Sequence, residues 1–192
     1  MVVNKHTYLE MINPKQTCWF PMRVTYGREL VIKAYLDKAS IENFIPMHYE
    51  FIEIKGERVK KLVPAINNLI FVRHTQEKLT ELKMYDRNFE PLRYMMRESI
   101  YDSIREIMTV GDEAMENFLK VAKEPTERVC FLSPSEYINN IGKKVKITQG
   151  PFAGVVGTIK RIKRNKHVVV QLEDIIAAAI DFVPKECLIE II

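Results

Sequence analysis

The stretch Gly150-Pro151-Phe152-Ala153-Gly154, with Gly157 three residues further on, decides the fold of the C-terminal part of this chain. Apolar and polar residues alternate on both sides of it, over 144–148 and 155–162, which indicates two paired strands. Glycine adopts positive φ without a Cβ clash, and proline fixes φ near the value that a turn needs. We therefore predict a β-hairpin. Turn geometry explains the glycines and the proline even in a barrel that binds nothing, whereas it does not explain the side chain of Phe152.

Length and composition predict a packed protein of two domains. The chain has 192 residues, of which 47% are hydrophobic and 28% are charged, values that separate it from disordered and fibrous proteins. Domains of about 100 to 150 residues are the most common and smaller ones occur, so we expect two. The longest apolar run, 175–180, is far shorter than the roughly 20 residues of a membrane-spanning helix. We expect no membrane segment.

The N-terminal residues, the cysteines and the histidines predict a cytoplasmic protein without a metal. Polar residues interrupt 1–16, so we expect no signal peptide. Cys18, Cys130 and Cys187 are odd in number, far apart and without a CxxC pair, which suits a reducing compartment. The four histidines show no ligand spacing with one another or with a cysteine. We therefore predict neither a metal nor a cofactor.

The positive charge of the chain is concentrated in one segment. The formal net charge is only +4, but residues 142–166 hold eight lysines and arginines and no aspartate or glutamate. Such a segment attracts phosphates or an acidic partner surface. Lysines that protect the edges of a solvated barrel from aggregation would give the same pattern, and both interpretations stay open.

The N-terminal part alternates strands and helices. We expect a strand at 18–24, a helix at 28–40 with Leu30, Val31, Ala34 and Tyr35 on one apolar face, and a hairpin made of 49–54 and 58–63. A buried strand at 68–73, a helix at 76–86 capped by Thr75 and a strand at 93–96 follow. This order predicts a ferredoxin-like α+β domain whose helices cover one face of an antiparallel sheet. The other face would be left free.

A third helix and a linker precede the C-terminal strands. Residues 112–123 carry an apolar stripe at helical spacing, and Pro125 ends the helix. The polar segment that follows is typical of a linker. Short strands at 144–148, 155–161, 168–172, 178–183 and 188–191 predict a small SH3-like barrel. The expected organisation is an N-terminal domain over 16–123, a linker over 124–136 and a barrel over 137–192.

These motifs together resemble a known family. The pattern Val145-x-Ile147-x-x-Gly150-Pro151-Phe152-x-Gly154-x-x-Gly157-x-Ile159 resembles the KOW motif, which consists here of Gly150, Pro151, Phe152, Ala153, Gly154 and Gly157. Trp19-Phe20-x-x-Arg23, Phe44-x-Pro46 and 69–72 resemble the N-terminal (NGN) domain of NusG transcription elongation factors. The resemblance covers 16–192. Within the family, the segments 23–30, 44–47, 62–65 and 162–164 look most like the UpxY-like specialised antiterminators of capsular-polysaccharide operons.

The resemblance implies a function without chemistry on a substrate. It implies an NGN domain that docks an apolar patch on the clamp helices of bacterial RNA polymerase, and thereby suppresses pausing or termination. Phosphates of nascent RNA or upstream DNA would contact the barrel, which in the family also meets Rho or the ribosome. The protein would act as a monomer. The residues expected to surround or form the polymerase-binding patch are Trp19, Tyr26, Phe44, Pro46, Asn68, Leu69 and Phe71. For Trp19, Phe44 and Phe71, packing inside the protein is the alternative. The expected nucleic-acid contacts are Arg161, Lys163, Arg164 and Lys166.

The sequence differs from general NusG proteins at two places, and two other functions are considered. General NusG proteins carry Phe-Pro-Gly-Tyr where this chain has 66–69, and its loop 173–177 differs from the loops that bind Rho or the ribosome. An RNA-binding or ribosome-associated KOW protein without polymerase contact is the alternative. An enzyme is not expected, because the sequence shows no nucleophile elbow, P-loop or HExxH motif.

Overall fold

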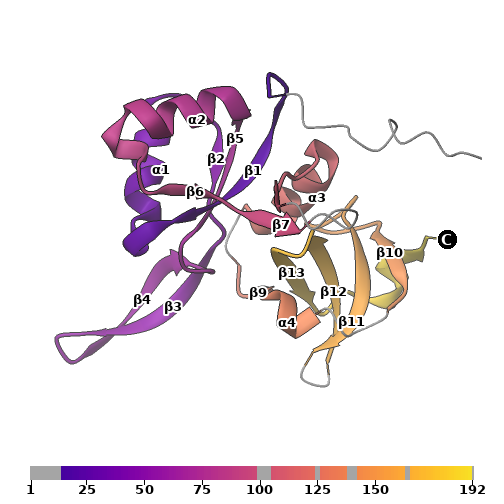
Figure 1. The fold of residues 1–192 in the computed structure, drawn as a ribbon. Helices are drawn as coiled ribbons and strands as arrows, with labels where there is room; N and C mark the ends of the chain where they lie inside the picture. Colours follow the sequence, from indigo (N-terminus) through magenta and orange to yellow (C-terminus); the bar gives the residue numbers. More distant parts are fainter. Residues whose placement is uncertain (1–13, 99–104, 124–125, 138–141, 163–164, 192) are drawn as a thin grey trace, which may run out of the picture.

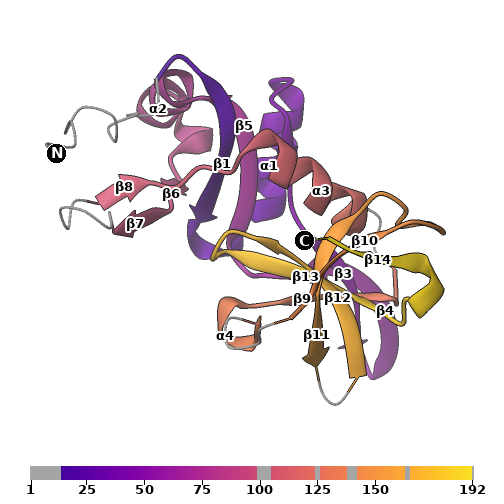
Figure 2. The same cartoon turned by 90° about the vertical axis from the view of Figure 1, so that its right-hand side faces the viewer.

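The computed structural model shows an α+β protein with two packed units joined through a helix (Figure 1, Figure 2). It describes residues 14–98, 105–123, 126–137, 142–162 and 165–191. None of the helices in these ranges is long and apolar enough to cross a membrane.

The N-terminal unit is built on a four-stranded antiparallel sheet in the order β2-β5-β1-β6. Its strands are β1 (Thr17–Val24), β2 (Asn43–Phe44), β5 (Leu69–Thr75) and β6 (Leu92–Tyr94). Helices α1 (Glu29–Lys38) and α2 (Gln76–Tyr85) lie on one face, and Thr75 Oγ1 caps α2 by accepting from the Lys78 amide at 3.2 Å. Two short 3-10 helices, η1 (Thr25–Gly27) and η2 (Arg87–Phe89), connect these elements.

The buried face of α1 differs from the expected one. Ile32 and Leu36 are buried against the sheet, together with Glu29, whereas Leu30, Val31 and Tyr35 are exposed. Apolar residues occupy almost every position from 30 to 36, so the period of the sequence fits two different faces. Contact with β1 and β5 decides between them.

A long hairpin projects from this unit. Strands β3 (Met47–Ile54) and β4 (Glu57–Pro64) pair with each other along their whole length, from Met47↔Pro64 to Ile54↔Glu57. Lys55 and Gly56 make the turn, both with positive φ. A shorter pair, β7 (Met96–Glu98) and β8 (Arg105–Ile107), follows the sheet.

The C-terminal unit is a six-stranded antiparallel sheet in the order β14-β10-β11-β12-β13-β9. The expected strands are present as β10 (Lys144–Ile147), β11 (Val156–Ile162), β12 (Asn165–Leu172), β13 (Ile176–Asp181) and β14 (Leu188–Glu190), with η3 (Lys185–Cys187) before the last. Strand β9 (Val129–Leu132) lies within the segment 124–136 that was expected to be a linker, and the short helix α4 (Pro134–Tyr137) ends one residue beyond it. Because β9 pairs with β13, this segment contributes a strand to the barrel.

Helix α3 (Asp112–Ala122) lies between the two units (Figure 2). It packs against β1 on one side and against β12 and β13 on the other. Its buried residues Met115, Phe118, Val121 and Ala122 belong to one apolar cluster that includes Trp19 and Phe71 of the sheet and Val145 and Val170 of the barrel. A second cluster, under α1 and α2, contains Phe20, Met22 and Leu36. The free sheet face that the sequence predicted is therefore covered.

Candidate functional site

Three of the expected polymerase-binding side chains lie beneath α3. Residues of β1 and β5 alternate between the two faces of the sheet, and Trp19, Leu69 and Phe71 point away from α1 and α2. Trp19 is only 4% exposed and Phe71 is fully buried. The Phe71 and Phe118 rings lie 6.4 Å apart. The sequence placed these side chains in or around a docking patch, with internal packing as the alternative for Trp19 and Phe71. In this structure all three are part of the core.

Phe44 and Pro46 mark the edge of the covered face. Phe44 is half-buried, and its ring meets the edge of Phe118 at a centroid distance of 6.4 Å. Pro46 is buried, and its carbonyl accepts from the Ala65 amide at 2.8 Å. Phe44 thus keeps a part of its side chain at the surface while Pro46 shapes the backbone beside it.

Tyr26 and Asn68 come together at the end of the sheet, although they are far apart in sequence. Asn68 Oδ1 accepts from the Gly27 amide at 3.0 Å, and the Asn68 carbonyl accepts from the Val24 amide at 2.9 Å. Tyr26 and Asn68 both have positive φ, which is unusual for tyrosine and indicates local strain. The Tyr26 side chain is 86% exposed, with the Arg28 guanidinium 5.7 Å from its ring centre. This loop therefore holds an aromatic side chain in solvent.

A buried carboxylate supports the same loop. Glu29 is 5% exposed, and its Oε1 accepts from the Asn68 amide at 3.4 Å. Its Oε2 has no hydrogen-bond partner among the described residues. An acidic residue in the first turn of a helix is so common that the sequence gives no signal of this role.

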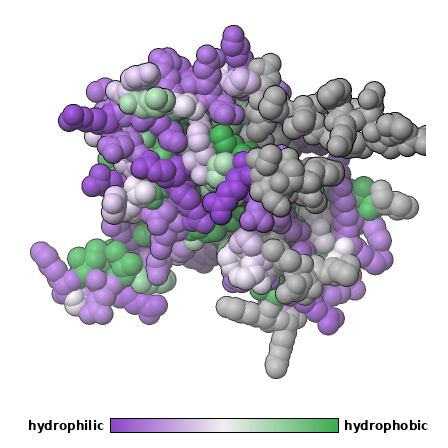
Figure 3. All heavy atoms as spheres, in the orientation of Figure 1, coloured by the Kyte–Doolittle hydropathy of each residue, from purple (hydrophilic) through white to green (hydrophobic). Residues whose placement is uncertain are grey.

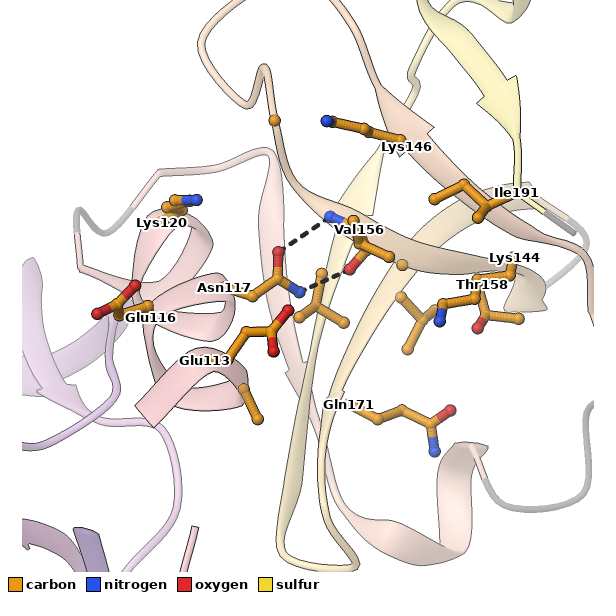
Figure 4. A pocket seen from close by; sticks show the side chains of 15 residues that line it. Glu113, Glu116, Asn117, Lys120, Lys144, Lys146, Val156, Thr158, Gln171 and Ile191 are labelled. Atoms are coloured by element: carbon orange, nitrogen blue, oxygen red, sulfur yellow. Dashed lines mark hydrogen bonds between the residues drawn. The ribbon is translucent and has the colours of Figure 1, made fainter. Parts of the chain in front are cut away.

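Two polar contacts hold α3 in place. Arg73 of β5 binds Asp112 at the start of α3 through two hydrogen bonds, Nε to Oδ1 and Nη2 to Oδ2, each 3.1 Å. On the barrel side, Asn117 Nδ2 donates to the Val156 carbonyl at 2.7 Å, and the Val156 amide donates to Asn117 Oδ1 at 2.9 Å (Figure 4). Asn117 therefore binds β11 as a neighbouring strand would. A signal for it exists in the sequence: a poor helix former next to the apolar stripe of α3.

A cleft of about 640 Å³ opens beside Asn117, between α3 and the barrel. Figure 4 shows Lys120, Glu113 and Glu116 on its helix side and Lys144 and Lys146 of β10 on its barrel side. The mixture of charges gives this cleft no single preference for an anion or a cation. Among the described residues, no group of three or more histidine, cysteine, aspartate or glutamate side chains could hold a metal ion.

The KOW turn adopts the expected backbone geometry. Gly150 and Gly154 have φ of 84° and 86°, and the Gly154 amide donates to the Ile147 carbonyl at 2.8 Å. A Cβ on Gly157 would lie 2.7 Å from Val168 Cγ1, so glycine is needed for close strand packing. Phe152 is buried in the cluster shared by both units, with the Arg128 guanidinium 5.9 Å from its ring centre.

Two of the four expected nucleic-acid contacts lie side by side. Arg161 of β11 pairs with Lys166 of β12, and both are exposed. Lys163 and Arg164 lie outside the described residues. Lys160, next to this pair in sequence, is buried, and loss of hydration lowers its pKa. The basic segment thus divides into an exposed pair and a lysine that faces the protein.

Comparison with known proteins agrees with this two-part organisation. The family model described as "Transcription termination factor nusG" matches residues 17–119, more than half of the chain, and the KOW motif model matches residues 141–173. A solved structure of NusG from Thermotoga maritima, which concerns its domain interaction, is similar with 17% identity and a TM-score of 0.46, over 93% of this chain and 99% of that one. No curated protein matches the sequence. The chain therefore belongs to the NusG family, whose members are transcription factors.

Proposed function

We propose that this protein is a transcription elongation and antitermination factor that binds bacterial RNA polymerase and suppresses pausing or termination. NusG-family proteins generally interact with RNA polymerase. The observation that carries the proposal is the exposed Tyr26, held on strained backbone at the end of a sheet that matches the NusG family model. The strand order β2-β5-β1-β6 supports a ferredoxin-like NGN domain, and the six-stranded unit supports an SH3-like KOW barrel.

The burial of the sheet face changes how the seven expected residues would act. Tyr26, Asn68 and the accessible part of Phe44 are available to the clamp of the polymerase without rearrangement. Trp19, Leu69 and Phe71 are the packed layer that fixes these three in position, since they lie on the same strands or beside the same loops. Aromatic anchors backed by rigid packing are typical of the centre of protein interfaces.

The mechanism is a population shift. A protein that binds the closed polymerase better than the open one stabilises the closed, elongating state by the difference of the two affinities. The barrel would add phosphate contacts to nascent RNA or upstream DNA through Arg161 and Lys166, and through Lys163 and Arg164 between them in sequence. A specialised role at capsular-polysaccharide operons is supported by the resemblance of four segments to the UpxY-like antiterminators, namely 23–30, 44–47, 62–65 and 162–164.

A charge at Tyr26 tests the polymerase contact. Tyr26→Asp should reduce capture of purified bacterial core polymerase at least tenfold, because the aspartate carboxylate replaces a ring at the centre of the contact. Aspartate tolerates positive φ better than tyrosine, so the fold should survive. Tyr85→Asp is the matched control, since Tyr85 is 79% exposed at the end of α2. Equal capture of both variants would disprove docking at Tyr26.

A ribosome-associated or RNA-binding KOW protein without polymerase contact is the second candidate function. The exposed Arg161–Lys166 pair favours it. Purification of the intact protein from growing cells separates the two: polymerase subunits support the first, ribosomal proteins or RNA alone support the second.

A further inference from the structure

The hairpin of β3 and β4 exposes more large apolar side chains than any other part of the surface described. Tyr49, Phe51, Ile54, Val59 and Leu62 are all exposed on it. Both strands pair only with each other, and the hairpin projects from the body of the molecule (Figure 1). Figure 3 shows hydrophobic residues gathered there, at the lower left. Because side chains alternate along paired strands, Tyr49, Phe51 and Leu62 share one face of the hairpin, and Ile54 and Val59 share the other. Exposed apolar patches commonly mark binding sites.

One face of the hairpin combines aromatic rings with cations. Tyr49 and Phe51 are two residues apart on β3 and therefore point to the same side. Lys60 lies directly across from Phe51, and Arg58, which pairs with Glu53, lies two residue pairs further toward the tip and so on the same face. The Lys60 Nζ is 4.8 Å from the ring centre of Tyr49, and the Arg58 Cζ is 4.6 Å from that of Phe51. The rings are 47% and 56% exposed.

This combination favours a nucleic acid over an apolar protein surface. A protein partner that covered the two rings would also have to bury Lys60, and lysine is depleted at the centre of protein interfaces because its desolvation is costly. Two aromatic residues at alternate positions of an exposed strand are the arrangement on which RNA-recognition sheets stack successive bases. The phosphates between those bases would form ion pairs with Lys60 and Arg58, so neither charge would be left without a partner in the complex.

A cleft beside this face adds groups that suit ribose. It has a volume of about 460 Å³, and His48, Tyr49, Phe51 and Lys60 of the hairpin line it. Thr126, Glu127 and Phe131 of β9 line it as well. Hydroxyl, imidazole and carboxylate groups can hydrogen-bond a 2′-hydroxyl, which both donates and accepts. These groups distinguish RNA from DNA.

We infer that this face of the hairpin binds single-stranded RNA. Tyr49 and Phe51 each stack a base, and Lys60 and Arg58 contact the phosphates. In the free protein Lys60 Nζ binds Glu127 Oε1 at 2.7 Å, so RNA must displace a carboxylate to reach this lysine. The inference is independent of polymerase docking, because the hairpin face contains none of the residues proposed for that contact.

Fluorescence anisotropy with the full chain and a labelled oligouridine of about 20 nucleotides tests the inference without polymerase. Saturable binding is expected. Tyr49→Ala and Phe51→Ala should each weaken it roughly 5- to 150-fold, the usual range for loss of one base–aromatic stack. Lys60→Ala should weaken binding and lower the salt dependence by about 0.7 in the log–log slope. Glu127→Gln should tighten binding, because it frees Lys60.

Lys61→Ala is the matched control, since Lys61 is the exposed neighbour of Lys60 on the opposite face of the hairpin. No binding of oligouridine, equal losses for Lys60→Ala and Lys61→Ala, or unchanged affinity after both aromatic substitutions would overturn the inference. Tighter binding of oligothymidine would overturn the assignment to RNA. If Tyr49→Ala and Phe51→Ala instead lose only polymerase capture, the face is a protein contact. Trp19 emission shows whether an aromatic variant is folded. If one is misfolded, the affinities of Glu127→Gln, Lys60→Ala and Lys61→Ala for oligouridine test the inference instead.

Discussion

The contact of Asn117 with β11 predicts how strongly the two units stabilise each other. Asn117 makes two hydrogen bonds to the backbone of Val156, of 2.7 and 2.9 Å, and the side chain is half-buried. Asn117→Ala removes both bonds and leaves the Val156 amide and carbonyl without these partners. Alanine is a better helix former than asparagine, so α3 itself is not weakened. The substitution thus acts on the contact between α3 and the barrel.

The magnitude follows from the number of bonds lost. A typical intramolecular hydrogen bond contributes about 0.5–1.5 kcal/mol net, so two of them contribute about 1–3 kcal/mol. For a chain of this size, about 1 kcal/mol shifts the melting temperature by roughly 2–4 °C. We therefore expect Asn117→Ala to lower the melting temperature by roughly 2–12 °C. Because one apolar cluster spans both units, the wild-type protein should melt in a single transition.

Thermal unfolding followed by two probes measures this effect. The chain has a single tryptophan, and Trp19 lies in the shared cluster, so its emission reports the N-terminal unit, whereas far-ultraviolet circular dichroism reports both. Glu116→Ala, on the same helix and exposed, is the control and should melt like the wild type. A melting temperature for Asn117→Ala equal to that of the control would refute the reasoning, because the two bonds would then not hold the units together.

Three further changes test single features of the structure. Glu29→Gln should leave the melting temperature unchanged or raise it, since it neutralises a buried carboxylate oxygen without a described partner; a fall would show that the charge is satisfied. Gly157→Ala should cost about 1–3 kcal/mol in urea unfolding, because its Cβ would clash with Val168. Burial and the nearby Asp112 carboxylate raise the pKa of the Cys18 thiol, so less of its thiolate is present at about pH 8. Iodoacetamide should therefore label Cys18 more slowly than the exposed Cys130, which mass spectrometry measures. At higher pH the Cys18 rate should rise toward that of Cys130, because the thiol then ionises.

Features that depend on neighbouring residues could be predicted from the sequence. The turn at Lys55-Gly56, the cap at Thr75 and the glycines of the KOW turn each follow from the local chemistry of two to four residues. The strand 69–75 could be recognised because Leu69 to Val72 is a continuous apolar run of strand length, and all four residues are buried. Such signals need no information about the rest of the chain.

Features that depend on residues far away in the sequence could not be predicted from the sequence. Strand β9, Val129 to Leu132, is itself an apolar run of strand length, but it directly follows the polar, proline-containing residues 124–128 and was therefore assigned to the linker. Its place in the barrel is set by pairing with β13, about 50 residues later. The prediction of which face of α1 is buried was wrong for the same reason. Residues 30–36 offer two apolar faces, and contact with the sheet determines which of them is buried. The hydrogen bond from the Gly27 amide to Asn68 Oδ1 likewise joins residues that are 41 positions apart in the sequence.

The same distinction explains where the surface available for binding was misplaced. From the sequence, helices on one face of a sheet imply an apolar second face open to a partner, and Trp19, Leu69 and Phe71 were expected there. Helix α3 and the barrel bury that face, so its side chains contribute stability in this state and cannot contact a partner directly. Among the exposed apolar side chains of the described residues are Tyr26 and, on the hairpin, Tyr49 and Phe51. Both places combine an aromatic ring with a cation within 6 Å, Arg28 at one and Lys60 or Arg58 at the other. At Tyr26 the cation is an arginine, a residue that protein interfaces favour, whereas the hairpin also carries Lys60, a residue that they disfavour and that phosphates attract. The first place therefore suits a protein partner and the second a nucleic acid.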